Sequence, residues 1–284
     1  TATSAKMLGL DSSKIVDALS HSVNMAGGLM QCWLEGTPEW LYASGLAAQN
    51  GLVSALLAER GANGARSSFA GPKGFLKAFC GHVPDDAEEL PAKMKKEFLT
   101  PKVTLKPYSV ITSILPVIHN AVVLRERESI SWDEIESVEI VAGPRVTQGP
   151  LAASILDSGP YVNKTQAYKS LPCAIGIALR FGTVLPHTVS KYKNQDVSGL
   201  AAVVEVKTDE SYESFYNSVA IVTRDGSKHT IEGEEFPSLE PERVRENLLL
   251  AASQYVGDKK AQEMIRVVEN LEKESVVSLS NCLS

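Results

Sequence analysis

A lysine and a tyrosine stand two positions apart, at Lys106 and Tyr108, where an extended segment gives way to an apolar helix. Polar and apolar side chains alternate over residues 102–106, as in a strand, and the apolar residues of 111–124 recur with the period of a helix. An ammonium group binds carboxylates and a phenol can transfer a proton, so this pair is suited to chemistry on a small organic acid. The alternative is a solvated surface lysine without a functional role.

Three further side chains have types that enzymes use. Lys169 is predicted at the beginning of a helix, where a cation opposes the helix dipole unless an anion compensates for it. Cys173 follows Pro172 near a helix start, a position that can lower the pKa of a thiol. His119 lies inside the apolar helix and is interpreted as a hydrogen-bonded structural residue. The structural alternatives are exposure to water for Lys169 and an inert, buried thiol for Cys173.

The sequence lacks the motifs of metal and cofactor sites. Its cysteines lie far apart without a CxxC spacing, at Cys32, Cys80, Cys173 and Cys282. A zinc site or a disulfide framework is therefore not expected, and a reduced intracellular setting, cytoplasmic or mitochondrial, fits best. No GxGxxG, GxxxxGK[ST] or HExxH pattern and no nucleophile elbow occurs. We expect neither a metal nor a cofactor.

Length and charge restrict the class of protein. With 284 residues and 44% apolar residues, the chain can bury the core of one large domain or of two ordinary ones. The formal charge of -6 and the absence of Lys/Arg clusters argue against nucleic-acid binding. No apolar run is long enough for a membrane span. Residues 1–10 enter a helical pattern without a targeting signal, and we expect a longer natural chain that begins upstream.

The first 61 residues read as helices. A cap at Asp11 precedes apolar residues that recur every three or four positions as far as Trp33. A second helix is predicted from about Gly45 to Arg60, with Gly61 as its C-terminal cap. Its small residues favour the close approach of a neighbouring helix, and they are Ala47, Ala48, Gly51 and Ala55.

The middle of the chain has the pattern of an α+β unit. Ser131 and Glu134 form a capping box, and a helix is predicted over residues 167–180. Strands are predicted at residues 138–141, 203–207, 219–223 and 229–231. Asp225-Gly226, between the last two, is the strongest hairpin signal in the sequence.

The helical period returns from Pro241. The predicted fold class is therefore α+β, an all-helical domain interrupted by an inserted α/β domain. The predicted boundaries are residues 1–100 for the first part of the helical domain, 101–237 for the inserted lid domain, and 238–284 for the C-terminal helices that complete the helical domain.

Three passages resemble the MmgE/PrpD family, which includes 2-methylcitrate dehydratases and cis-aconitate decarboxylases. Residues 42–61 (YASGLAAQNGLVSALLAERG) resemble the family stretch HxGxAAxxGxxAAxLAxxG. Residues 106–108 (KPY) resemble KxYP, and residues 167–179 (AYKSLPCAIGIAL) resemble AxxSLPYAVAxAL. The three passages occur in the family order, and the predicted helical domain with an inserted lid agrees with the family fold.

The resemblance implies a metal-free lyase that acts on small di- or tricarboxylates in a cleft between the helical domain and the lid, usually as a homodimer. Lys106 matches the motif lysine and would bind or polarise a substrate carboxylate. Tyr108 matches the motif aromatic residue and would shape the pocket. Cys173 occupies the position of the tyrosine of SLPY, and with Lys106 and Tyr108 it completes the expected catalytic set.

The sequence also departs from the family pattern. Trp40 and Ala43 replace a lysine and a histidine that cis-aconitate decarboxylases place before the glycine motif, and Ser109 and Ile111 replace polar or proline positions after Tyr108. These changes favour a substrate with more apolar surface, because an unpaired carboxylate is costly to desolvate. The expected substrate-binding residues are Trp40, Tyr42, Lys169 and Ile111.

The leading hypothesis is a divergent lyase, a dehydratase or decarboxylase of secondary metabolism, whose partner is a small organic acid or a derived metabolite. The resemblance also implies an acidic residue and a histidine from an N-terminal helical segment that has no counterpart in this sequence. The alternative is therefore a non-catalytic or repurposed paralogue, cyclase-like or acting by association, that keeps the fold and the dimer surface.

Overall fold

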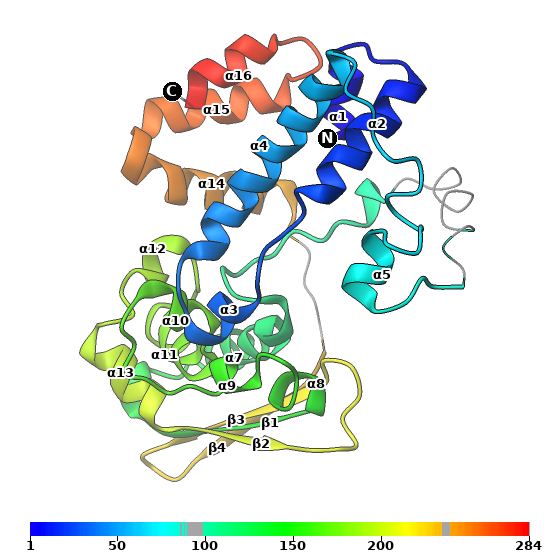
Figure 1. Cartoon of the computed structure of the whole chain (residues 1–284). Helices are drawn as coiled ribbons and strands as arrows, with labels where there is room; N and C mark the ends of the chain where they lie inside the picture. Colours follow the sequence, from blue (N-terminus) through cyan, green and yellow to red (C-terminus); the bar gives the residue numbers. More distant parts are fainter. Residues whose placement is uncertain (86, 88, 90–98, 235–238, 284) are drawn as a thin grey trace. The chain divides into compact units, whose positions relative to one another are not determined.

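The structure, a computed structural model, describes residues 1–85, 87, 89, 99–234 and 239–283 (Figure 1). It divides into two compact units. Unit 1 consists of Thr1–Trp33 and Thr37–Val103, and unit 2 of Leu34–Gly36 and Thr104–Ser284. Helices and a mixed sheet both occur, which confirms the predicted α+β class. The predicted boundaries of a helical domain and an inserted lid stay predictions.

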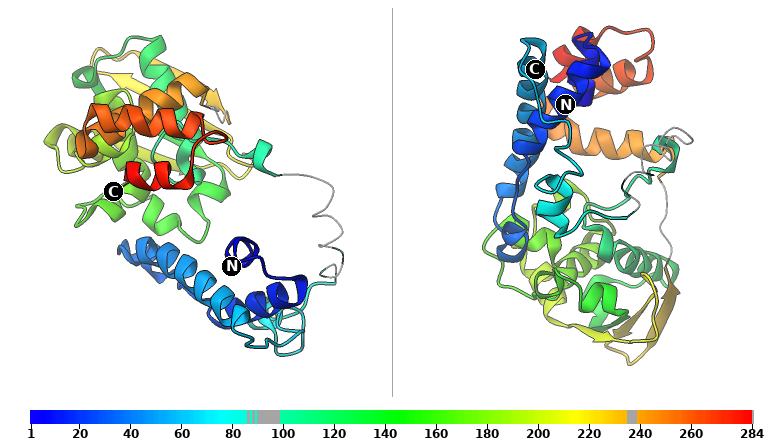
Figure 2. Two further views of the ribbon diagram at one scale, coloured as in Figure 1. Left: turned by 90° about the horizontal axis from the view of Figure 1, so that it is seen from above. Right: turned by 45° about the vertical axis from the view of Figure 1, so that its right-hand side comes forward.

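Unit 1 is helical. Its elements are α1 (Ala2–Met7), α2 (Ser12–Asn24), α4 (Glu39–Glu59), α5 (Phe75–Cys80) and the 3-10 turn η1 (Thr100–Lys102), and α3 (Gln31–Glu35) leads from unit 1 into the segment of unit 2. Helices α2 and α4 lie side by side (Figure 2). A small core of four alanines joins α1, α2 and α4, formed by Ala5, Ala18, Ala55 and Ala58.

The helices of unit 1 agree in part with the sequence predictions. Asp11 caps α2 as expected, because its side chain accepts a hydrogen bond from the Lys14 amide at 2.9 Å. The apolar period predicted as far as Trp33 does not continue as one helix, since α2 ends at Asn24 and α3 begins at Gln31. Of the small residues of α4, Gly51 and Ala55 are buried as predicted, whereas Ala47 and Ala48 are exposed.

Unit 2 is built on a four-stranded sheet with the order β2-β1-β3-β4. The strands are β1 (Ile135–Ala142), β2 (Val204–Thr208), β3 (Asn217–Thr223) and β4 (Lys228–Gly233). Strand β2 is parallel to β1, and β3 is antiparallel to both β1 and β4. The four predicted strands are confirmed, and so is the hairpin, where Gly226 has a φ of +84°.

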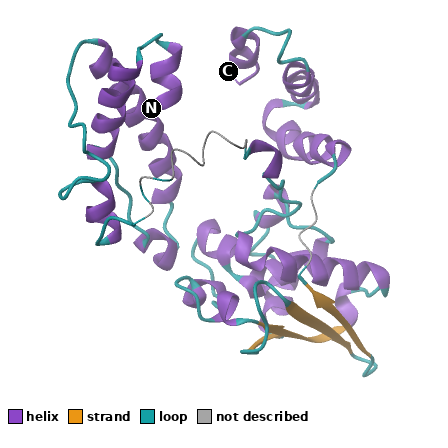
Figure 3. Ribbon diagram, turned by 90° about the vertical axis from the view of Figure 1, so that its right-hand side faces the viewer, coloured by secondary structure: helices purple, strands orange, loops and turns teal. Residues whose placement is uncertain are grey.

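Helices cover one face of this sheet (Figure 3). They are the 3-10 turns η2 (Thr112–Ile114) and η3 (Trp132–Glu134) together with α7 (Leu115–Arg127), α8 (Pro144–Thr147), α9 (Ala152–Ile155), α10 (Lys164–Lys169), α11 (Leu171–Phe181), α12 (Pro186–Val189) and α13 (Gln195–Ala202). Helix α7 packs on β3 and β4, and α11 packs between α7 and α13. Val138 and Ile140 of β1 and Ile221 of β3 have no exposed surface, which places the core between sheet and helices.

The strand predicted over residues 102–106 is wrong. Lys102 ends the turn η1, and its amide donates to the Leu99 carbonyl at 2.9 Å. Val103 and Leu105 are exposed, so their alternation with polar residues does not bury one face of a strand. Alternation alone is not sufficient, because a strand also needs a neighbouring strand to pair with.

The helix predicted over residues 167–180 is also wrong, because it is two helices. Helix α10 ends at Lys169 and α11 begins at Leu171. Between them, Ser170 is extended, with φ −69° and ψ 123°, and its hydroxyl accepts the Cys173 amide at 3.0 Å as an N-terminal cap. Pro172 lacks an N–H group and would clash with the carbonyl four residues earlier, so one continuous helix cannot pass through it.

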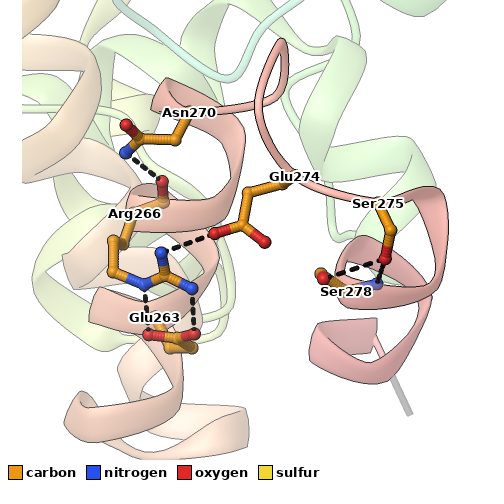
Figure 4. A network of polar contacts seen from close by, with 6 residues as sticks. All are labelled: Glu263, Arg266, Asn270, Glu274, Ser275 and Ser278. Atoms are coloured by element: carbon orange, nitrogen blue, oxygen red, sulfur yellow. Dashed lines mark hydrogen bonds and ion pairs between the residues drawn. The ribbon is translucent and has the colours of Figure 1, made fainter.

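The C-terminal helices are α14 (Pro241–Val256), α15 (Asp258–Glu269) and α16 (Val276–Leu283), as the helical period predicts. An ion-pair network supports the turn between α15 and α16 (Figure 4). Arg266 holds both carboxylate oxygens of Glu263, at 2.7 and 2.8 Å, and one oxygen of Glu274 at 2.7 Å. Because Arg266 and Glu263 are exposed, we expect the network to orient the turn more than to stabilise it.

A glycine permits the close contact between α11 and α13. A Cβ atom at Gly176 would lie 2.6 Å from the Val197 carbonyl oxygen, a backbone atom that cannot move aside easily. We expect Gly176→Ala to lower the free energy of unfolding by about 2 kcal/mol, because this overpacking outweighs the better helix propensity of alanine. Urea unfolding measures the effect. Gly199→Ala in α13 is the matched control, since nothing lies within 4 Å of its added Cβ. It should leave stability unchanged or raise it, and equal losses in both variants would contradict the prediction.

In the part of the chain that the structure describes, the helices are all too short or too polar to cross a lipid bilayer.

Candidate functional site

Lys106 and Tyr108 lie in an irregular segment of unit 2 that precedes η2. Lys106 is exposed, and its Nζ donates a hydrogen bond to the Val110 carbonyl at 3.2 Å. Partial loss of water around the ammonium group lowers the pKa of Lys106. The lysine is therefore a cation held near its own backbone at the surface of unit 2.

Tyr108 is paired with a histidine from the helix that follows. Its hydroxyl lies 3.3 Å from Nδ1 of His119 in α7, and the two ring centroids are 6.1 Å apart. Burial, and secondarily the negative charge of Glu126, raises the pKa of Tyr108 to about 12. The phenol is therefore protonated at neutral pH and able to donate a proton or a hydrogen bond, with the imidazole as a partner that can gain or lose a proton.

Lys169 is deeply buried, with 1% of its surface exposed. It is the last residue of α10 and does not open a helix as predicted, so the helix dipole favours its charge. It lines a pocket of about 270 Å³ in unit 2 together with Leu34, Ala153, Ser154, Leu156, Asp157 and Gln166. Lys106 is not among these lining residues, so the two lysines belong to different surroundings.

A polar network lies beside this pocket. The Ser170 hydroxyl donates to the Asp157 carbonyl at 2.6 Å, and the Tyr161 hydroxyl contacts that carbonyl at 3.1 Å and Ser170 Oγ at 2.8 Å. Burial is the main cause that raises the pKa of the Tyr161 phenol. The carboxylate of Asp157 accepts the Gly159 amide at 2.9 Å. These contacts tie the segment after α9 to the junction of α10 and α11.

Cys173 does not have the lowered pKa expected at a helix start. The thiol is completely buried in α11, and burial, followed by the negative charge of Asp157, raises its pKa to about 12. At neutral pH the sulfur is a neutral thiol and not a nucleophilic thiolate. The helix N-terminus does not offset the loss of water.

The remaining expected site residues lie in different places. Ile111 precedes η2 and is 9% exposed, so it belongs to the core of unit 2. Trp40 and Tyr42 are in α4 of unit 1. Trp40 is half-buried and its ring lies 5.2 Å from that of Trp33, while Tyr42 is exposed. Unit 2 thus brings Tyr108 next to His119, and Lys169 next to the polar network around Cys173.

Comparison with protein families gives a match over the first part of the chain. Residues 1–87 match the MmgE/PrpD N-terminal domain. This match supports membership of the MmgE/PrpD family. The matched domain suggests a lyase-like function, and it includes residues 42–61, which carry the first of the three resemblances. A search of curated proteins found no match.

Sequence reasoning did not identify all the residues that gather in unit 2. His119 is hydrogen-bonded as predicted, but its partner Tyr108 was not foreseen, and Asp157 and Tyr161 were not singled out. The only signal for His119 was a polar residue within an apolar helix. Asp157 and Tyr161 gave no signal for this network, because Ser170 and Cys173, the partners that link them to the start of α11, are more than eight residues away in sequence.

Within the described residues, no three side chains of His, Cys, Asp or Glu gather in a group that could hold a metal ion. The candidate residues of unit 2 include ammonium, phenol, imidazole and hydroxyl groups, which can transfer protons or bind anions.

Proposed function

We propose that this MmgE/PrpD protein is a lyase, a dehydratase or decarboxylase, that acts on a small carboxylate or on a more apolar metabolite derived from one. The observation that carries the proposal is the contact of 3.3 Å between the Tyr108 hydroxyl and Nδ1 of His119. Tyr108 belongs to the KPY motif and follows Lys106 by two positions. The contact supplies a proton donor and a proton acceptor, and a cation stands two residues before the tyrosine in the sequence.

Each of these residues has a distinct proposed role. Lys106 binds a substrate carboxylate, which it can do because its ammonium group is reachable from solvent. Tyr108, with a pKa of about 12, keeps its proton at neutral pH and donates it to the leaving hydroxyl or to the carbanion that remains after loss of carbon dioxide. His119 accepts a proton from the substrate or restores the one that Tyr108 gives away.

The experiment is a turnover assay of the protein on cis-aconitate, 2-methylcitrate and alkylated citrates. We expect Lys106→Ala to lower turnover about 100-fold, the loss typical when one electrostatic contact to a developing charge is removed. Lys102→Ala is the matched control, because Lys102 is also exposed and lies four residues earlier. It should leave turnover unchanged. Equal turnover of Lys106→Ala and wild type would exclude Lys106 from the mechanism.

A second candidate function is a non-catalytic or repurposed paralogue. It is favoured by the surface position of Lys106, whose Nζ contacts a backbone carbonyl, and by the neutral, buried Cys173. Melting temperatures separate the two candidates, because a competent site stabilises the fold when it binds its ligand. A lyase should melt at a higher temperature with one of the assayed acids, whereas a paralogue that has lost the site should show neither a shift nor turnover.

A further inference from the structure

Another pocket lies entirely within unit 1. Its volume of about 450 Å³ falls inside the range of roughly 300–1,000 Å³ that small-molecule sites occupy. Val23 and Ala26, at the end of α2 and just after it, form one wall, and residues of the segment 65–79, which includes α5, form the other. The pocket therefore uses none of the residues that we assign to the lyase site.

The loop that frames this pocket is held in one shape by its own backbone. The Phe75 amide donates to the Ser68 carbonyl at 2.8 Å, and the Leu76 amide donates to the Phe69 carbonyl at 3.0 Å. Gly74 is buried beside these two carbonyls, and a Cβ atom added to it would lie 2.8 Å from each of their oxygens. The loop is thus fixed without a ligand, so little conformational entropy is lost when one binds.

Two stacked phenyl rings form much of the apolar surface of the pocket. The ring centroids of Phe75 and Phe79 are 4.4 Å apart, with an angle of 29° between the ring planes. Both residues line the pocket, and Phe79 is 59% exposed, so part of its ring surface is open to a ligand. Aromatic rings favour offset-stacked or edge-to-face contacts with a further ring. The apolar part of a ligand is therefore best matched by an aromatic group.

The charge of the pocket has one sign. Of the described residues that line it, Lys73 alone is charged, and its ammonium group has no ion-pair partner in the part of the chain that the structure describes. No acidic residue occurs between Glu59 and Asp85, so this segment has no carboxylate of its own to repel an anion. Water solvates the exposed Lys73 and no ligand is required to balance it, but the charge favours an anion over a cation. The hydroxyl groups of Ser67 and Ser68 also line the pocket and can donate to a carboxylate.

We propose that this pocket binds a small aromatic monocarboxylate, whose ring stacks on Phe75 and Phe79 and whose carboxylate meets Lys73. The proposal concerns binding and not a reaction. It goes beyond the proposed lyase activity, because it involves other residues, in unit 1, and another class of ligand. It is tested by binding alone and stands or falls independently of turnover.

The first test compares ligands on the wild-type chain. Saturation-transfer NMR titrations measure the binding of phenylacetate, of phenylacetamide, which lacks the charge, and of cyclohexylacetate, which lacks the aromatic ring. We expect saturable binding of phenylacetate in the millimolar range, as is usual for a ligand of about ten non-hydrogen atoms. Each analogue should bind at least about threefold more weakly, because it loses either the contact with the ammonium group or the ring stacking. Absence of saturable phenylacetate binding, or equal affinity for phenylacetate and either analogue, would overturn the proposal.

The second test uses variants of the pocket. Lys73→Met removes the charge of an exposed side chain, so it should bind phenylacetate only as weakly as the wild type binds phenylacetamide, with its affinity for phenylacetamide unchanged. Phe79→Ala should weaken the binding of both ligands at least about threefold. Lys6→Met is the matched control, because Lys6 is an exposed lysine of α1 that does not line the pocket, and it should bind both ligands like the wild type. Wild-type affinity for phenylacetate in Lys73→Met or in Phe79→Ala would show that the acid binds elsewhere. If Phe79→Ala alters the fold of the loop, Lys73→Met and the ligand series decide.

Discussion

Asn217→Ala should lower the free energy of unfolding by about 4 kcal/mol, because it opens a buried network of side-chain amides. Asn217 has no exposed surface and begins β3, and Asn120 of α7 is 4% exposed. Nδ2 of Asn120 donates to Oδ1 of Asn217 at 2.9 Å, and Nδ2 of Asn217 donates to the carbonyls of Gly233 at 2.9 Å and Phe215 at 3.1 Å. Alanine would leave several of these groups buried without a partner, beside a new cavity.

Urea unfolding of three further variants tests this explanation. Thr230→Ala on β4 is the control, because Thr230 is exposed, and its effect should stay within about 0.5 kcal/mol. Asn120→Ala should resemble Asn217→Ala. The double variant should cost much less than the sum of the two single changes, since both remove the same network. A small loss in Asn217→Ala, or additive losses in the pair, would show that the network does not hold α7 on the sheet.

Structural features that depend on residues close together in the sequence were predicted correctly. The hairpin at Asp225-Gly226 forms because glycine tolerates the positive φ that the turn requires. In η3, the Glu134 carboxylate accepts the Ser131 amide at 3.3 Å, as the capping-box pattern indicated. Both features are fixed within four residues of chain, so no distant contact has to be known.

Features that depend on distant partners were not predicted. The strand expected over residues 102–106 has no sheet to join among the described residues. The break at Ser170, by contrast, has a local signal in Pro172 that the prediction of one helix did not use. The pair of Asn120 and Asn217, 97 residues apart, is invisible to periodicity. Where local patterns compete, or where a partner lies far along the chain, the fold is decided by packing that the sequence alone does not display.

The candidate site also shows which properties the sequence predicts and which depend on the folded structure. The sequence singled out Lys106, Tyr108 and Lys169 by type and motif, but exposure distinguishes them: Lys106 lies at the surface, whereas Lys169 is buried beside a pocket. His119 became a candidate only through its contact with Tyr108. A residue type indicates which chemistry is available, and burial decides which charge state that chemistry starts from.

Cys173 shows this dependence of charge state on burial, and it leads to an expected loss of stability at alkaline pH. Burial raises the pKa of the thiol from an ordinary value of 9.0 to about 12. The native state therefore holds its proton more tightly than the unfolded state. The contribution of the protonated Cys173 thiol to stability is fully present below about pH 9 and is lost as the pH rises to about 12. The loss is at most about 1.4 kcal/mol per pH unit, or about 4 kcal/mol over the whole interval.

Urea unfolding of wild type and Cys173→Ala from pH 7 to pH 11, under reducing conditions, measures this contribution. Cys173→Ala should be less stable at pH 7 because of the cavity it leaves, but its stability should fall less steeply above pH 9. Tyr108 and Tyr161 also have raised pKa values, but both proteins contain them, so the difference in slope reports the thiol together with its influence on the pKa of Tyr161. Cys80→Ala removes an exposed thiol and should keep the wild-type slope. Parallel curves for wild type and Cys173→Ala would show that the buried sulfur does not govern the alkaline limit. A shallower curve would show that the buried Cys173 thiol keeps its proton in the native state at alkaline pH.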